Sequence, residues 1–102
     1  MNAARVRAGS FSIPPDHPCL PGHMPGAPIV PGALLLDRAM DLIAALGLAS
    51  MPGAPIGVKF PGAVGPGEEV DLHCDMSRAG TIVFEGRVGA RLVLSGRIGA
   101  AS

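Results

Sequence analysis

The pattern of apolar and polar residues changes period once along the chain, and this change predicts one helix followed by several strands. From Gly32 to about Ala45, apolar side chains occupy nearly the whole circumference of a helix that turns by about 100° per residue. The polar exceptions, Asp37, Arg38 and Asp41, fall in one narrow stripe. A helix that is apolar on almost every side is expected to be buried.

After a Pro/Gly-rich linker at 50–55, apolar residues recur at every second position, which is typical of strands with one face in water. Strands are predicted at about 4–8 and at 56–60, 70–76, 81–88 and 91–98. Turn-forming residues occur at 66–67, 78–80 and 89–90. An antiparallel meander is the simplest arrangement of these strands.

Together these elements predict an α+β fold in which one hydrophobic helix lies across a curved antiparallel sheet that wraps it. The 102 residues are expected to form a single domain over 1–102. A domain of this size buries only about 60 to 70% of its unfolded surface, so contacts with a partner subunit would add burial. Its core must be mainly aliphatic, because the sequence has three Phe and neither Trp nor Tyr.

Charge and hydropathy exclude several classes of protein. The formal net charge is zero, whereas nucleic-acid binding normally requires a concentrated basic face. No apolar run reaches the roughly 18 residues of a membrane span, and residues 1–12 lack the apolar run of a secretory signal. We interpret Cys19 and Cys74 as free thiols, with Cys74 in the core and its neighbour His73 exposed on the opposite strand face. A cytoplasmic protein is therefore expected.

Residues 14–31 contain too much Pro and Gly for a helix or a central strand, and we expect a structured loop there. Loops of about 18 residues in compact domains are usually functional. His23 lies in this loop and is followed by Pro25, Pro28 and Pro31, whose fixed φ angles leave the chain few conformations. An imidazole held this stiffly is a candidate general base near neutral pH.

The start of the predicted helix supplies two further groups. The backbone N–H groups of Gly32 and Ala33 have no partner inside the helix and carry partial positive charge, so they can polarise a carbonyl oxygen. Asp37, if withdrawn from water among apolar side chains, would hold a proton for a leaving hydroxyl group. A base, an acid and stabilisation of an enolate together describe a β-elimination.

Structural explanations of the same residues stay open. A lone His in a Pro/Gly loop is more often a surface residue than a catalyst, and Asp37 could belong to a solvated helix face. His17, Cys19 and His23 could ligate a metal, but a structural zinc site normally needs a fourth ligand. No metal is therefore expected.

The block from Pro21 to Asp37 resembles the hot-dog-fold 3-hydroxyacyl-carrier-protein dehydratases of fatty acid synthesis. In that family a His precedes Pro-Gly, a further Pro and a Pro-Gly at the helix start, and an acidic residue follows the His by fourteen positions, as Asp37 follows His23. The run from Val58 to Glu68 resembles the strand and turn after the family's central helix. The short chain is similar to the compact dehydratase-like proteins of aryl-polyene and other specialised lipid pathways.

The resemblance implies a hot-dog fold and dehydration of a 3-hydroxyacyl thioester, held by acyl carrier protein, to a trans-2-enoyl thioester. It implies that His23 is the base or orients water, that Asp37 is the acid, and that Gly32, Ala33 and Phe60 contact the substrate. It also implies a homodimer or a dimer of dimers, with the His and the acid of one site on different chains, and no cofactor.

Carrier proteins of this family are acidic, so the resemblance implies cationic side chains at the mouth of the substrate tunnel. The candidates are Lys59, Arg87, Arg91 and Arg97. The sequence departs from the family where Met24 replaces an aromatic residue and Pro61-Gly62 replaces basic ones. Two other functions stay open. One is a hot-dog acyl thioesterase, in which the helix carboxylate activates water, and the other is a non-catalytic subunit that completes the site of an active homologue.

Overall fold

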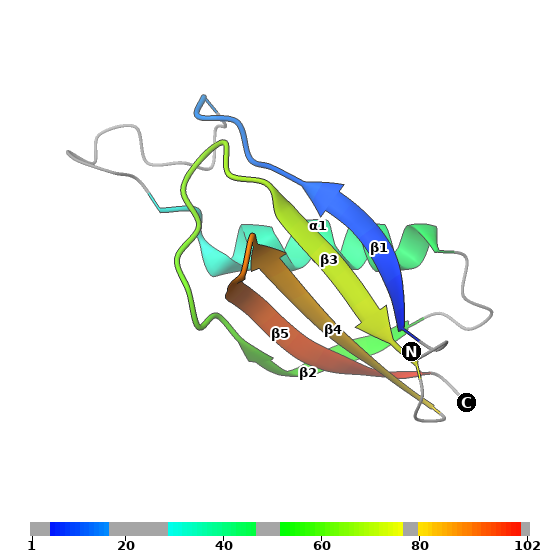
Figure 1. Cartoon of the computed structure of the whole chain (residues 1–102). Coiled ribbons are helices and arrows are strands. Elements are labelled where there is room, and N and C mark those ends of the chain that lie inside the picture. Colours follow the sequence, from blue (N-terminus) through cyan, green and yellow to red (C-terminus); the bar gives the residue numbers. More distant parts are fainter. Residues whose placement is uncertain (1–4, 17–28, 47–51, 77–79, 101–102) are drawn as a thin grey trace.

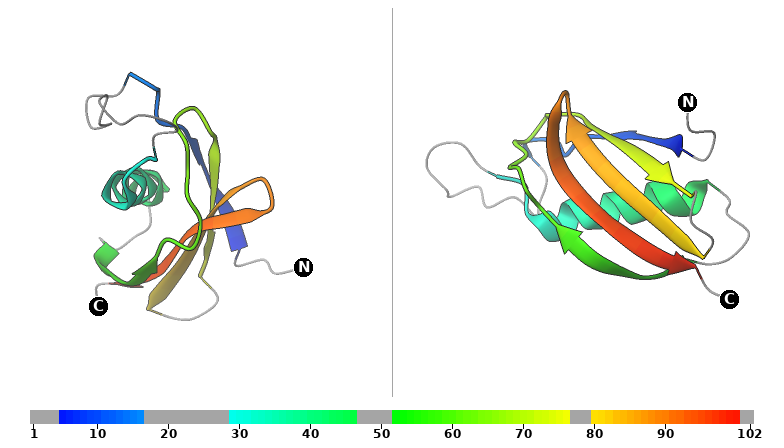
Figure 2. Two further views of the ribbon diagram at one scale, coloured as in Figure 1. Left: turned by 90° about the vertical axis from the view of Figure 1, so that its left-hand side faces the viewer. Right: turned by 60° about the horizontal axis from the view of Figure 1, so that its bottom comes forward.

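One helix, α1, packs against a five-stranded antiparallel sheet that curves around one side of it (Figures 1 and 2). The structure is a computed structural model that describes residues 5–16, 29–46, 52–76 and 80–100. The elements are β1 (Arg5–Phe11), α1 (Gly32–Ala45), β2 (Pro52–Lys59), β3 (Val70–Asp75), β4 (Thr81–Val88) and β5 (Arg91–Ala100). The expected α+β class and the predicted bounds of the helix are confirmed.

The strand order in the sheet is β1-β3-β4-β5-β2. The predicted meander is confirmed for β3, β4 and β5, but β2 lies at the far edge beside β5 and does not neighbour β3. The helix carries the chain from β1 at one edge to β2 at the other, so residues 60–69 must return across the end of the sheet to reach β3 (Figure 1).

Two strand boundaries differ from the sequence prediction. Strand β1 continues to Phe11, beyond the predicted end near residue 8, because its pairing with β3 resumes after an irregularity between Arg7 and Gly9. Strand β2 begins at Pro52, inside the predicted linker. Prolines are tolerated there because β2 is an edge strand with irregular register against β5.

The alternating pattern of β3 is confirmed, with Val70, Leu72 and Cys74 buried and the residues between them half-exposed. The expectation that the helix is buried on nearly every side is wrong for the single chain. Only one stripe of α1, formed by Leu35, Ala39 and Ile43, is buried. The physical reason is that one sheet covers one side of a helix, and the opposite side stays uncovered (Figure 2).

No helix in the described part of the chain is long and apolar enough to cross a membrane.

Replacing Gly96 by Ala is expected to lower the free energy of unfolding by about 1–3 kcal/mol through overpacking of the core. A Cβ atom at this position would lie 2.7 Å from Cζ of Phe84, the largest fully buried side chain. Gly99→Ala is the matched control on the same strand, because a Cβ there meets no atom within 4 Å. Urea unfolding measures both variants, and equal midpoints would contradict tight packing between β4 and β5.

Candidate active site

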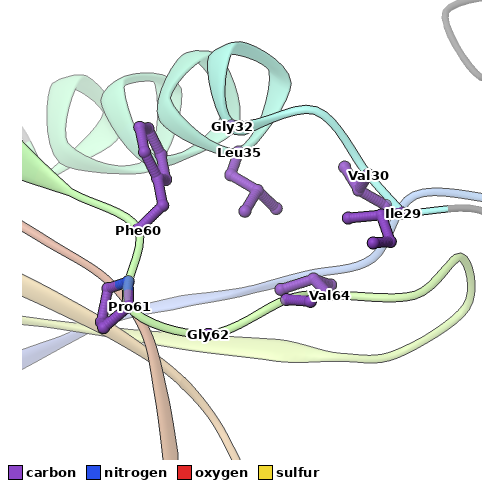
Figure 3. A pocket seen from close by; sticks show the side chains of 9 residues that line it. Ile29, Val30, Gly32, Leu35, Phe60, Pro61, Gly62 and Val64 are labelled. Atoms are coloured by element: carbon purple, nitrogen blue, oxygen red, sulfur yellow. The ribbon is translucent and has the colours of Figure 1, made fainter.

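A pocket of about 300 Å³ lies between the start of α1 and the segment that follows β2 (Figure 3). Its floor and walls are apolar, with Val30, Leu35 and Val64 facing the space beside Phe60. The full lining is Ile29, Val30, Gly32, Leu35, Phe60, Pro61, Gly62, Ala63 and Val64. An apolar space of this size at the start of a helix suits an apolar chain that ends in a polar group.

The first turn of α1 has no side-chain cap, since Pro31 occupies the N-cap position. The intrahelical bonds from this end begin with the N–H groups of Leu34 and Leu35, which both donate to the Pro31 carbonyl oxygen at 3.0 and 3.3 Å. The N–H groups of Gly32 and Ala33 precede these bonds, so they belong to the set that helix geometry leaves without an internal acceptor.

Gly32 and Phe60 are in close contact at the pocket. A Cβ atom built on Gly32 would lie 3.0 Å from three ring atoms of Phe60. The missing side chain therefore lets the aromatic ring lie over the helix start, although the ring stays 44% exposed. Of the three residues predicted to bind substrate, Gly32 and Phe60 line the pocket, whereas Ala33 is exposed beside it.

Asp37 does not line this pocket. It lies further along α1, on the face that the sheet leaves exposed, so the condition of burial among apolar side chains is not met within one chain. His23 lies outside the described residues, as do His17 and Cys19. The pairing of His23 with Asp37 therefore stays a prediction from the sequence.

The only cysteine in the described residues, Cys74, is a core thiol, as the alternation on β3 predicted. Burial raises its pKa to about 11, so the thiol is neutral at physiological pH. His73 lies on the opposite face of β3 and is half-exposed. Within the described ranges no three His, Cys, Asp or Glu side chains come together as metal ligands.

The four cations predicted at the tunnel mouth divide into two kinds. Arg91 forms an ion pair with Glu68 at 2.9 Å, and Arg87 contacts Glu85 at 3.4 Å. Lys59 and Arg97 form no ion pair with any residue that the structure describes. Both line a second hollow, of about 290 Å³, on the outer face of the sheet. Lys59 lines this hollow, and the next residue along the chain, Phe60, lines the pocket.

The family of the chain follows from comparison with known proteins. Residues 2–97 match a family model described as ApeI-like, ApeI dehydratase. The chain belongs to the ApeI-like dehydratase family. This membership confirms the dehydratase-like resemblance that was carried by the block around His23 and Asp37.

Two curated relatives of this ApeI-like chain are named 3-hydroxyacyl-(acyl-carrier-protein) dehydratase FabZ. The protein from Anaeromyxobacter sp. is 32% identical over an alignment of length 84, which covers 70% of this chain and 53% of that protein. The protein from Gluconobacter oxydans is 26% identical over an alignment of length 102, which covers 90% of this chain and 60% of that protein. The ApeI-like chain thus spans between about half and three fifths of the length of these relatives.

A solved structure, "The Dehydratase Heterocomplex ApeI:P from Xenorhabdus doucetiae", contains a chain of the same fold. The TM-score is 0.72, at 18% sequence identity. The superposition covers 100% of this chain and 97% of the chain from the heterocomplex. The likeness concerns the fold, and it identifies the helix and five-stranded sheet as the hot-dog fold. The predicted fold class is therefore confirmed.

Sequence reasoning missed most of the pocket walls in the ApeI-like chain. It singled out Gly32 and Phe60, but not Val30, Leu35 or Val64, which complete the enclosure. The available signal was the third Pro/Gly-rich run, at 61–67, which resembles a simple turn in the sequence. In the structure it forms one wall of the pocket.

Cys74 is expected to resist alkylation by iodoacetamide at pH 8 in the folded protein and to react after unfolding, because only the thiolate is nucleophilic. Since burial raises its pKa from the ordinary value of 9.0 to about 11, the unfolded state loses the thiol proton first. The contribution of this thiol to stability is therefore complete below pH 9 and declines as the pH rises toward 11. Peptide mass spectrometry distinguishes Cys74 from Cys19, and rapid labelling of native Cys74 would contradict its burial.

Proposed function

We propose that the chain removes water from a 3-hydroxyacyl thioester to give a trans-2-enoyl thioester. The observation that carries this proposal is the apolar pocket beside the uncapped start of α1, where Gly32 and Phe60 meet. Membership of the ApeI-like dehydratase family supports the same reaction, as do the names of the two curated relatives.

In the proposed reaction His23 takes a proton from C2 of the substrate while the C3–O bond breaks. Asp37 gives a proton to the departing hydroxyl group, and the electron pair of the C2–H bond forms the new double bond. The products are therefore the enoyl thioester and one water molecule. The N–H groups of Gly32 and Ala33 stabilise the charge that develops on the thioester oxygen, a contribution that is large wherever such donors are preorganised.

The exposed position of Asp37 supports a site that a second chain completes. A catalytic acid needs an environment that lets it hold a proton, and solvent does not supply this. A partner placed over the uncovered face of α1 would enclose Asp37 and bring its own His23 loop into reach. That partner is a second copy of this chain or a homologous subunit, and the related dehydratase was solved as a heterocomplex.

Acyl carrier protein is the proposed donor of the substrate, consistent with the names of the curated relatives. Lys59 and Arg97 are the proposed contacts for its acidic surface, because both are exposed and neither is paired with an acid of the described chain. Arg91 is excluded from this role, since its guanidinium group is already paired with Glu68.

Replacing His23 or Asp37 by Asn is expected to lower the rate of enoyl thioester formation by about 10²-fold or more, as for other general acid and base residues. The assay follows the absorbance of the conjugated enoyl thioester. Asp41→Asn is the matched control, because Asp41 is an exposed carboxylate one turn from Asp37 on the same helix. An unchanged rate in His23→Asn would contradict the assignment of the base.

The same assay distinguishes the other candidate functions. Release of free thiol without enoyl product would establish a thioesterase. Turnover that requires an added homologue would establish a partner-dependent subunit, whereas a purified homodimer with full activity would exclude that role.

Replacing Lys59 or Arg97 by Gln is expected to raise the KM for a carrier-bound substrate by about two- to fivefold, the effect of losing one exposed charge contact. The KM for the same acyl group on free pantetheine should stay unchanged. Arg7→Gln is the matched control, because Arg7 lies on β1 and is paired with Asp71 at 2.8 Å. Equal effects on both substrates would contradict a carrier contact at this hollow.

A further inference from the structure

The segment 60–69, between β2 and β3, holds two distant parts of the chain together at the pocket (Figure 1). The N–H group of Val30 donates to the carbonyl oxygen of Val64 at 2.8 Å. The N–H group of Gly67 donates to the carbonyl oxygen of Ile13, also at 2.8 Å. Ile13 and Val30 are buried, at 2% and 3% exposure. They stand just before and just after residues 14–29, which include His23.

Glu68 closes this segment into a turn by contacts in both directions. Its Oε1 atom accepts a hydrogen bond from the N–H group of Gly65 at 2.8 Å, and its own N–H group donates to the Gly65 carbonyl oxygen at 3.2 Å. Gly67, inside this turn, has a φ angle of 85°, which favours glycine. The turn brings Val64 and Gly67 into the positions from which they bind Val30 and Ile13.

Arg91 ties the same turn to the sheet. Its Nη2 atom donates to both carboxylate oxygens of Glu68, at 2.9 and 3.0 Å, from the start of β5. The Gly65 N–H group and then Arg91 lower the pKa of Glu68, so its carboxylate is charged at neutral pH. Gly62 lies against β5 as well, since a Cβ atom there would come within 2.8 Å of the Leu92 carbonyl oxygen. The segment that forms the pocket wall is thus held against β5 at Gly62 and at Glu68.

We propose that Glu68, held by Arg91, is a positioning residue. It fixes the pocket wall and, at the same time, the two residues that flank the segment containing His23, namely Ile13 and Val30. The inference rests on the proposed dehydratase function, since it concerns the placement of that reaction's groups. Glu68 touches no reacting atom. It acts through Val64 and Gly67, whose contacts with Val30 and Ile13 fix where the chain enters helix α1 and where it leaves β1.

The position of this ion pair distinguishes it from the other pair shorter than 3 Å among the described residues. Arg7 and Asp71 are 2.8 Å apart, compared with 2.9 Å for Arg91 and Glu68, and are similarly exposed. They join two strands that are already paired by backbone hydrogen bonds. Exposed ion pairs contribute little to global stability. Loss of the Glu68 pair is therefore expected to alter local order and catalysis, with little change in the unfolding midpoint.

The experiment compares Glu68→Ala with Glu69→Ala and Asp71→Ala, which remove a neighbouring exposed carboxylate and the partner of Arg7. Amide hydrogen exchange is followed by NMR at Val30 and Gly67, with Leu72 in β3 as the internal reference. In Glu68→Ala we expect exchange at Val30 and Gly67 to be about tenfold faster and exchange at Leu72 to be unchanged. We expect kcat/KM for the 3-hydroxyacyl thioester to fall by about tenfold or more, since small misplacements at a site are costly.

Glu68→Gln keeps an oxygen that can accept from Gly65, so we expect a smaller effect on both measurements and a folded protein in any case. Unchanged exchange at Val30 and Gly67 in Glu68→Ala would overturn the proposal. Faster exchange with unchanged kcat/KM would overturn the positioning role. If the wild-type chain forms no enoyl thioester, the proposed function fails, while the exchange rates still decide whether Glu68 holds the segment.

Discussion

The contact between the stripe Leu35, Ala39 and Ile43 of α1 and the inner face of the sheet is the constraint on which the rest of the molecule depends. Each large aliphatic side chain buried there contributes roughly 1.5–3 kcal/mol relative to exposure. Residues four apart share one helix face, so this stripe orients the helix about its axis. The orientation turns Asp37 away from the core, toward the side that the sheet leaves uncovered.

The route of the chain across the sheet creates the pocket. Because β2 pairs with β5 at one edge and β3 pairs with β1 near the other, the connecting residues must pass the end of the sheet beside the start of α1. Phe60 and Val64 lie on this return path and become a wall of the pocket. A connection in a simple meander would have turned back at once and left no such wall.

Neighbouring side chains give identical charges different roles. Arg91 and Arg97 are both on β5 and both exposed, yet Arg91 is paired with Glu68 and holds the wall of the pocket. Arg97 lines the outer hollow with Lys59 and Glu85, and neither cation forms an ion pair with a described acid. The difference follows from the segment that lies beside each residue, which decides whether a cation stabilises the fold or is available to an acidic partner.

The sequence by itself determined the helix Gly32–Ala45, the strands β3 and β4 and the dehydratase-like family, because periodicity and motif spacing are local properties of the chain. The sequence also singled out Gly32 and Phe60 as candidate substrate contacts, and both line the pocket. Tertiary structure alone decided the strand order, the start of β2 at Pro52, the one-sided burial of α1 and the link between Glu68 and Arg91. These features depend on contacts between residues that are far apart along the chain, and such contacts exist only once the sheet has formed around the helix.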